Sequence, residues 1–205
     1  MGFDQGDSLR RPRSLGNAWA LPGFVAGLAA VLAVAGDPAR AWLRYDRQGI
    51  EGGEFWRLVT GHFVHLGWSH CALNLLGLVL VWYLVGSHFR VIEWLLISFV
   101  AIIGIDLGFW LLEPQLVWYV GLSGWLHALL AAGAIGGFAL ARGESLALAA
   151  VLLVKLAYEQ VAGPLPGSEP STGGAVVVVA HLYGAIAGAV AAAVLAIRSR
   201  PGQSI

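Results

Sequence analysis

Six long apolar runs constrain this chain of 205 residues more than any other feature. A helix needs about 20 predominantly apolar residues to cross the ~30 Å hydrocarbon core of a membrane, and each run approaches that length. Hydrophobic residues make up 58% of the chain and charged residues 12%, which is too much apolar surface for one water-soluble core of this size. The sequence therefore predicts an all-α polytopic membrane protein, built as a bundle of six transmembrane helices. The predicted spans are Ala18–Ala35, His70–Gly86, Val91–Leu112, Ser123–Ala141, Leu146–Ala162 and Ala175–Ile197.

The chain is predicted to form one membrane domain. We expect residues 18–197 to make up this domain, with cytoplasmic tails at residues 1–17 and 198–205. The formal net charge is zero, which argues against a nucleic-acid partner because surfaces that bind nucleic acid carry an excess of basic residues. Cys71 is the single cysteine, so the chain has neither an intramolecular disulfide nor a cysteine-based zinc site.

The arginines predict the orientation through the positive-inside rule. If six spans alternate, the basic residues near the helix ends fall on one side, and the loops at 112–121 and 163–174 contain no Lys or Arg. The long first loop, residues 36–69, contains four arginines but also four acidic residues. We therefore expect both termini in the cytoplasm and the first loop outside. The arginines assigned to the cytoplasmic side are Arg10, Arg11, Arg13, Arg90, Arg142, Arg198 and Arg200.

The first apolar run has a second interpretation. Basic residues, an apolar stretch and then Ala33-Val34-Ala35 are also the pattern of a secretory signal peptide with its cleavage site. The stretch is longer than the ~7–15 apolar residues usual in such a signal, which favours an uncleaved helix. The loop charges are compatible with both interpretations, because cleavage leaves the orientation of the other spans unchanged.

Four polar side chains are predicted to lie at one depth in the outer part of the bundle. His70 and Asn74 begin the second span and Ser123 begins the fourth, and both spans run inward. His181 lies six residues into the sixth span, about 9 Å below its outer end at ~1.5 Å per residue. Polar groups at membrane depth are costly, so we interpret each as a candidate functional residue.

The chemistry of these residues is that of acyl transfer. A serine hydroxyl becomes an effective nucleophile when an imidazole removes its proton, and the developing oxyanion then requires hydrogen-bond donors. His70 and Asn74 project from one helix face, so both can donate toward one oxygen. Gly121 and Gly124 lie close to Ser123 and let backbone amides approach a substrate. Taken singly, each element also has a structural interpretation, as a serine at a helix start, a core histidine or an interhelical hydrogen-bonding pair.

Four segments occur together in an order and spacing that resemble a known family. They are Glu54-Phe55-Trp56-Arg57, His65 with His70 and Asn74, Gly121-Leu122-Ser123-Gly124, and Ala180-His181 with Gly184 and Gly188. From about Glu54 to Gly188 the chain resembles the rhomboid intramembrane serine proteases. The resemblance implies that Ser123 is the nucleophile and His181 the general base. It also implies an oxyanion hole made by the side chains of His70 and Asn74 with the Ser123 amide, and close packing of Gly184 against the fourth span.

A second set of segments is similar to the rhombosortase branch of that family. These segments are Trp56–His62, Leu122–His127, Lys155–Gln160 and Ala180–Gly184. The similarity implies a protease of the bacterial inner membrane whose active site lies toward the periplasm. Its substrates would be exported proteins with a C-terminal transmembrane anchor, cut at a Gly-Gly sorting motif. The alternatives are a general rhomboid protease without Gly-Gly preference and a non-catalytic rhomboid-like protein that binds helices.

Four other polar residues lie outside the nucleophile, base and oxyanion-hole positions. The better-known rhomboids place a tyrosine four residues after the nucleophile, stacked on the catalytic imidazole, where this chain has His127. His127 is then a stacking partner, a hydrogen-bond orienter of His181 or a competing base, and we favour the first two. Lys155 and Glu159 are four residues apart on the fifth span and are expected to neutralise one another. Asp106 in the third span has no obvious local partner.

Two further classes of function compete with proteolysis. The first is zinc binding by a group of histidines, namely His62, His65, His70 and His127. The sequence lacks H-E-x-x-H, and no carboxylate accompanies these histidines in the pattern that zinc proteases use, so we expect no metal and no cofactor. The second is transport, which is disfavoured because intramembrane charges are few and no inverted repeat is visible.

Overall fold

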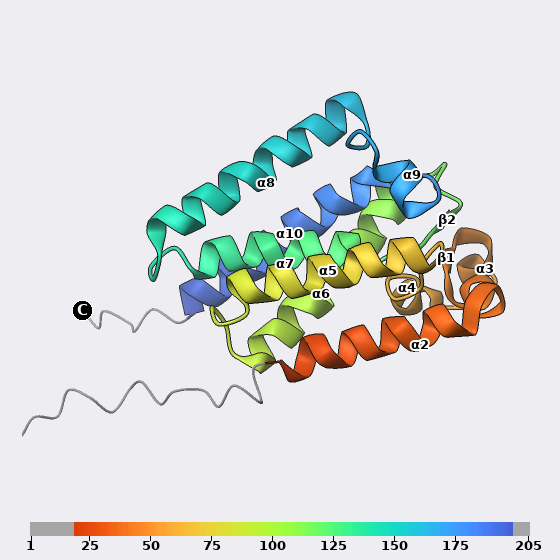
Figure 1. Cartoon of the computed structure of the whole chain (residues 1–205), viewed down its shortest axis with the longest axis horizontal. Coiled ribbons are helices and arrows are strands. Elements are labelled where there is room, and N and C mark those ends of the chain that lie inside the picture. The colour runs from red at the N-terminus through yellow and green to blue at the C-terminus, as the bar shows by residue number, and fades with distance from the viewer. Residues whose placement is uncertain (1–18, 199–205) are drawn as a thin grey trace, which may run out of the picture.

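The computed structural model of the chain describes residues 19–198, which form a bundle of helices (Figure 1). The expected tails at 1–17 and 198–205 lie outside the described residues, except for Arg198. The helices are α2 (Ala20–Leu43), α3 (Arg47–Glu51), α4 (Arg57–Thr60), α5 (Trp68–Val85), α6 (Val91–Leu112), α7 (Ser123–Gly136), α8 (Arg142–Ala162), α9 (Ser168–Thr172) and α10 (Val178–Arg198). Two short strands, β1 (Tyr45–Asp46) and β2 (Trp118–Tyr119), pair antiparallel, with Tyr45 opposite Tyr119.

Five of the described helices are long and apolar enough to cross a membrane, namely α2, α5, α6, α8 and α10. The fourth predicted span is shorter than expected, because α7 has 14 residues and ends at Gly136 rather than Ala141. At ~1.5 Å per residue this helix is about 21 Å long. Two adjacent glycines, Gly136 and Gly137, favour a helix end, and residues 137–140 form a turn. α7 contacts α5, α6, α8 and α10, so it is the central helix of the bundle.

Other predicted boundaries also differ from the structure, and the fifth span begins at Arg142 rather than Leu146. The first span ends near the predicted Ala35, because Gly36 is non-helical, with φ of 68°, and a second helical segment continues beyond this kink to Leu43. Pro38 lies in the first turn after the kink, where a missing N–H is tolerated. The sixth span begins at Val178 rather than Ala175, so His181 lies three residues into α10 and not six.

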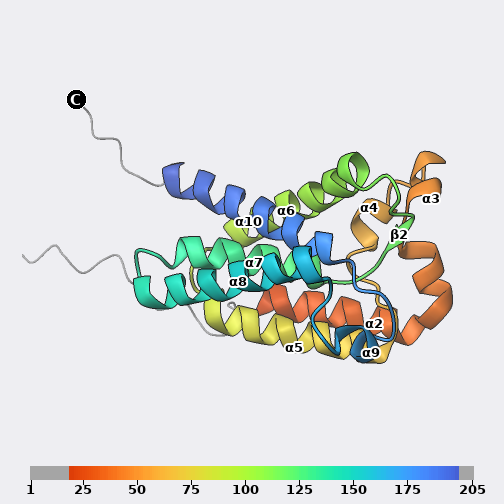
Figure 2. The same ribbon diagram turned by 90° about the horizontal axis from the view of Figure 1, so that it is seen from above.

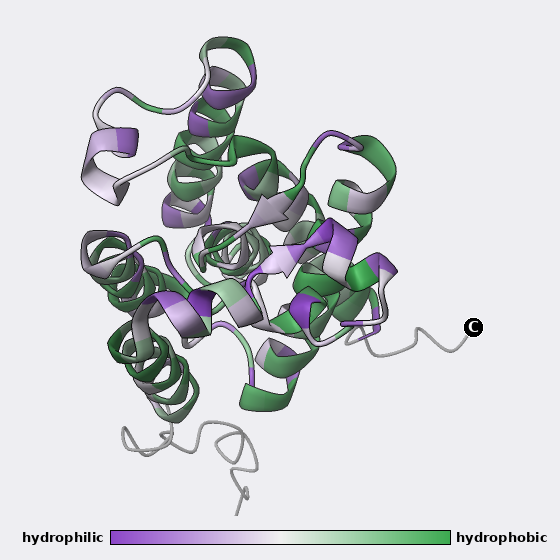
Figure 3. Ribbon diagram, turned by 90° about the vertical axis from the view of Figure 1, so that its right-hand side faces the viewer, coloured by the Kyte–Doolittle hydropathy of each residue, from purple (hydrophilic) through white to green (hydrophobic). Residues whose placement is uncertain are grey.

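The ends of the bundle are different in character. α2 begins and α10 ends at one end of the bundle, and α3, α4, α9 and the two strands gather at the other (Figure 1). Figure 2 shows α2 beside α5 and α8 beside α7, and both pairs are in contact. Hydrophilic residues concentrate on the segments that connect the helices, whereas the helices themselves are mainly hydrophobic (Figure 3). This distribution is what a lipid environment around the helices requires.

Glycine permits the closest helix contact in the bundle, between α7 and α10. A Cβ on Gly184 would collide with the backbone carbonyl of Gly124, and one on Gly188 would collide with the carbonyl of Ala128. Close backbone approach of this kind is a main source of helix association in lipid. The sequence also contains Gly23 and Gly27 at the same spacing, but a Cβ at either would meet nothing within 4 Å. Glycine spacing alone therefore does not identify a packed surface.

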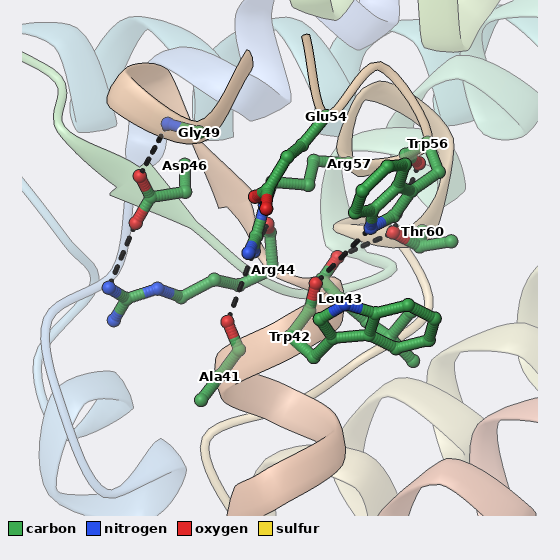
Figure 4. Close-up of polar contacts among 10 residues, drawn as sticks. All are labelled: Ala41, Trp42, Leu43, Arg44, Asp46, Gly49, Glu54, Trp56, Arg57 and Thr60. Atoms are coloured by element: carbon green, nitrogen blue, oxygen red, sulfur yellow. Dashed lines mark hydrogen bonds and ion pairs between the residues drawn. The ribbon is translucent and has the colours of Figure 1, made fainter. Parts of the chain in front are cut away.

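The first loop caps the C-terminal end of α2 (Figure 4). The last carbonyls of a helix lack partners within it. Arg57, which is 8% exposed, donates to the carbonyls of Ala41 and Arg44 at 3.0 and 3.1 Å and binds Glu54 at 2.5 Å. Thr60 donates to the Leu43 carbonyl at 2.6 Å. The loop is thereby fixed as part of the folded domain.

A second arginine of the loop performs the same task for α6. Arg47 donates to the carbonyls of Phe109, Glu113 and Leu116 at 2.6, 2.9 and 3.1 Å. A cation at this end also complements the helix dipole. Two of the four arginines of the first loop, Arg47 and Arg57, thus bind helix ends, whereas Arg40 and Arg44 pair with Asp37 and Asp46.

The Gly184 contact generates a prediction about stability. Gly184→Ala is expected to lower the free energy of unfolding by about 1–3 kcal/mol, because the added methyl group meets a backbone carbonyl that cannot move without shifting α7. The matched control is Gly27→Ala, where the space is open and alanine is the better helix former. Unfolding in detergent, followed by circular dichroism, measures both. Equal stability of the two variants would contradict the close α7–α10 contact.

Candidate active site

Ser123 and His181 meet where α7 and α10 begin. Ser123 is the first residue of α7, and His181 lies in the first turn of α10. Ser123 Oγ lies 2.9 Å from His181 Nε2. His181 is buried. Gly124 directly follows Ser123, and Gly184 lies about one turn after His181, and these two glycines let the helices approach closely enough for the contact. The pair is therefore positioned by backbone packing.

A carboxylate contacts the other nitrogen of the same imidazole. Glu159, near the outer end of α8, places Oε2 2.9 Å from His181 Nδ1. A carboxylate accepts hydrogen bonds, so in the neutral ring Nδ1 carries the proton and Nε2 is free to accept from the Ser123 hydroxyl. The second oxygen, Oε1, accepts from Lys155 Nζ at 2.7 Å. The expectation that Lys155 and Glu159 only neutralise one another is incomplete, because Glu159 also binds His181.

His127 covers one face of the His181 ring. The two rings are stacked, with centroids 4.2 Å apart and planes 14° from parallel. His127 Nδ1 lies 2.7 Å from the backbone oxygen of Ser123, and since a carbonyl only accepts, Nδ1 is a donor. The ring thus has the stacking position that sequence reasoning favoured, and its bond to the backbone also ties it to the start of α7.

Two side chains on α5 face the segment that precedes Ser123. A Cβ on Gly121 would lie 2.9–3.0 Å from the ring of His70 and 3.7 Å from Asn74 Nδ2. Gly121 has φ of 123°, so both its conformation and this close approach require glycine. Asn74 Nδ2 is a buried donor without a hydrogen-bond partner in the described part of the chain. His70 Nδ1 accepts from the Leu66 amide at 3.4 Å, which leaves the neutral ring with its proton on Nε2.

The segment around Gly121 is held by residues outside the spans. Tyr119 donates to the Gly121 carbonyl at 2.6 Å, and burial raises the pKa of Tyr119, so the phenol keeps its proton. His62 lies edge-on to Tyr119 and 3.3 Å from Asp106 on α6. Asp106 therefore has a partner, but one that is 44 residues away in the sequence.

Burial, with a smaller contribution from His70, lowers the pKa of His65 to about 3, so His65 is uncharged at neutral pH.

The sequence-predicted residues thus come together in the structure, and one neighbour was missed. Glu159 lies three residues before the end of α8, and His181 three residues after the start of α10. The depth comparison applied to the other helices would place Glu159 and His181 in one layer. This shared depth is the sequence signal that could have identified Glu159. Among residues 19–198, the group of metal-capable side chains with ligand atoms within 4.8 Å of one another is His127, Glu159 and His181. This group shares only His127 with the four histidines considered for zinc. Its members contact one another through the hydrogen bond and the ring stacking described above.

The structure thus places a serine and an imidazole at hydrogen-bond distance, on neighbouring helices of an apolar bundle. The Rhomboid domain family model matches residues 52–198, so the chain belongs to the rhomboid family of intramembrane serine proteases. The comparison with curated protein sequences gives no match. Rhomboid proteases act on membrane proteins within the bilayer.

The position of His127 generates a prediction about activity. His127→Phe preserves an aromatic ring against His181 but loses the bond to the Ser123 carbonyl, a contact worth about 0.5–1.5 kcal/mol. We expect cleavage of a membrane-anchored reporter to fall by about 2- to 10-fold, whereas His181→Phe is expected to be inactive. If the folded His127→Phe protein has no activity and His181→Phe retains it, His127 is the base instead.

Proposed function

We propose that the protein is a rhomboid serine protease in which Ser123 is the nucleophile and His181 the general base. The observation that carries this proposal is the 2.9 Å contact between Ser123 Oγ and His181 Nε2, in a chain of the rhomboid family. A hydrogen bond from the hydroxyl to a bare imidazole nitrogen is the arrangement that activates serine. His181 is buried and Ser123 half-buried, which favours charge stabilisation by fixed groups over stabilisation by water.

The proposed acylation moves one proton and exchanges one bond. His181 Nε2 takes the Oγ proton as Oγ attacks the carbonyl carbon of the scissile peptide bond, and the carbonyl π electrons move onto its oxygen. Collapse of this tetrahedral intermediate breaks the C–N bond, and Nε2 gives its proton to the departing amine. The acyl ester on Ser123 is then attacked by water or by another amine, with His181 taking the proton of that nucleophile and returning it to Oγ.

The oxyanion of the intermediate is proposed to lie between α5 and the start of α7. The donors are Asn74 Nδ2, His70 Nε2 and the Ser123 amide. Asn74 supports this assignment because its buried Nδ2 is without a partner in residues 19–198, as a donor kept for a transient acceptor would be. The first amides of a helix are also unpaired and polarised toward an anion.

The proposed membrane placement has six crossings, with α7 as the short central one. Both termini are assigned to the cytoplasm of a bacterial cell and the active site to the periplasmic side of the inner membrane. The start of α2 and the end of α10 at one end of the bundle agree with an even number of crossings (Figure 1). Arg90 precedes α6 and Arg142 begins α8 at that proposed cytoplasmic side, in accord with the positive-inside rule.

The proposed substrates are exported proteins held by a C-terminal transmembrane anchor with a Gly-Gly motif. A protease must receive its peptide in extended form, because a helix hides the scissile carbonyl behind its own hydrogen bonds. Each glycine weakens a helix by ~1 kcal/mol relative to alanine, so a Gly-Gly pair near the outer end of an anchor unwinds readily. The similarity of four segments to rhombosortases supports this choice over a general rhomboid protease.

The catalytic assignment predicts the effect of four substitutions. Ser123→Ala and His181→Ala are each expected to abolish cleavage of a membrane-anchored reporter while the protein still folds. Asn74→Ala or His70→Ala is expected to cost ~2.7–4 kcal/mol of transition-state stabilisation, or about 10²- to 10³-fold in kcat. Cleavage kinetics in proteoliposomes, with helicity as the folding control, measure these effects. Full activity of Ser123→Ala would end the serine-protease assignment.

The substrate assignment predicts a requirement for glycine in the anchor. Replacement of both glycines of a Gly-Gly anchor by leucine is expected to block processing, because leucine keeps the segment helical. The matched comparison is an anchor in which two other residues of the span are changed to leucine. Processing is followed by the mobility of the released protein, and insertion by membrane fractionation. Equal cleavage of both anchors would favour a general rhomboid protease and leave the roles of Ser123 and His181 intact.

A further inference from the structure

Glu159 is a buried carboxylate that the proposed chemistry has not yet used. It lies on α8, is 3% exposed, and has both oxygens engaged. Oε1 binds Lys155 Nζ at 2.7 Å and Oε2 binds His181 Nδ1 at 2.9 Å. A carboxylate at membrane depth is costly, so a position that contacts the imidazole directly calls for a function.

The contact decides which nitrogen of His181 holds the proton. Lys155 Nζ also lies near Nδ1, at 3.5 Å, and a bond from this ammonium would require a bare Nδ1 and a protonated Nε2. A neutral ring in that tautomer could not accept the Ser123 proton. The carboxylate is nearer to Nδ1, and the ammonium already donates to Glu159 at 2.7 Å. The nearer acceptor therefore favours the reactive tautomer.

We propose that Glu159 is a positioning residue that completes a Ser123–His181–Glu159 triad, with Lys155 holding the carboxylate in place. The inference rests on the proposed function of Ser123 and His181. The proton on Nδ1 stays on the ring throughout, and Glu159 only accepts its hydrogen bond. When Nε2 takes the serine proton, the ring becomes a cation, and the adjacent carboxylate stabilises that charge in a site with little water.

The other groups that face His181 do not supply this charge. From α7 come the stacked ring of His127 and the hydroxyl of Ser123, and α8 brings Lys155 as a cation. His70 on α5 is a further imidazole of the site and lies near enough to interact electrostatically with His181. Within the described residues, Glu159 is the carboxylate that forms a hydrogen bond with His181.

A purely structural role for Glu159 makes different predictions. An open groove of about 890 Å³ lies among α7, α8 and α10. In a structural role Glu159 would tether α8 and neutralise Lys155. Removal of both charges together would then relieve the unpaired ammonium and restore function. In the triad, the double variant still lacks the acceptor for Nδ1 and stays impaired.

The test compares four variants of the full-length protein in detergent, with a fluorophosphonate probe that reports serine reactivity without a protein substrate. Glu159→Gln is expected to slow inactivation by the probe by about 10⁴-fold, the order found when a triad acid is removed. Lys155→Met/Glu159→Gln is expected to remain as slow as the single variant. Glu159→Asp keeps the charge and is expected to react faster than Glu159→Gln. Glu113→Gln is the control. The hydroxyl of Tyr183, which lies two residues after His181 on α10, donates to Glu113 Oε1 at 2.7 Å, so Glu113 binds the same helix through a residue other than His181.

Thermal unfolding of each variant separates reactivity from folding. The triad predicts folded Glu159 variants with slow labelling, and with kcat rather than KM reduced for a cleavable anchor. Restoration of the rate in the double variant, wild-type labelling of Glu159→Gln, or failure of every Glu159 variant to fold would each overturn it. Ser123→Ala distinguishes failure of the proposed function from failure of the Glu159 inference. If wild-type protein and Ser123→Ala label alike, the assignment of Ser123 as the nucleophile fails. If wild type labels and Ser123→Ala does not, the Glu159 variants test the Glu159 inference alone.

Discussion

The close backbone contact between α7 and α10 is the constraint on which the rest of the site depends. Gly184 and Gly188 let α10 lie against the carbonyls of α7, and no side chain separates the two helices there. Ser123 and His181 lie at the outer end of this contact, so their 2.9 Å separation follows from the helix packing. In lipid, where apolar attraction between helices is weak, such packing is a principal means of fixing helix geometry. The geometry of the reacting groups is therefore as rigid as the core.

Hydrogen bonds among the polar groups around His181, and between arginines and helix ends, lower the cost of placing these groups in a membrane. His181 lies between Ser123 and Glu159, and Glu159 in turn binds Lys155. Arginines of the first loop bind the last carbonyls of α2 and α6, where each helix has backbone acceptors without internal partners. Buried side-chain atoms without a partner among the described residues include Asn74 Nδ2, His62 Nδ1 and both ring nitrogens of His65. Asn74 faces Gly121, two residues before Ser123, and in the proposed mechanism its Nδ2 donates to the substrate oxyanion.

The sequence predicted the membrane class and the shared depth of Ser123, His181, His70 and Asn74, because apolar length and helix rise are local properties. The rhomboid family was predicted by the resemblance of its motifs. The sequence did not predict that α7 ends at Gly136. The apolar run continues past this residue, and the contacts of α7 with four other helices are not visible in the sequence. The partner of Asp106 was missed because His62 is distant in the sequence. Glu159 was assigned to Lys155 alone, since an i,i+4 pair is visible in sequence whereas a contact between α8 and α10 depends on tertiary packing. Gly-Gly preference depends on substrate contacts and is still a prediction.

The central claim is that His181 activates Ser123 as the nucleophile. Its most direct test is to treat membranes containing the protein with a fluorophosphonate, digest the protein and locate the adduct by mass spectrometry. The account predicts a single adduct on Ser123 in wild-type protein and its loss in His181→Ala, which retains the serine but lacks the base. An adduct on another serine, or equal labelling of Ser123 with and without His181, would contradict it.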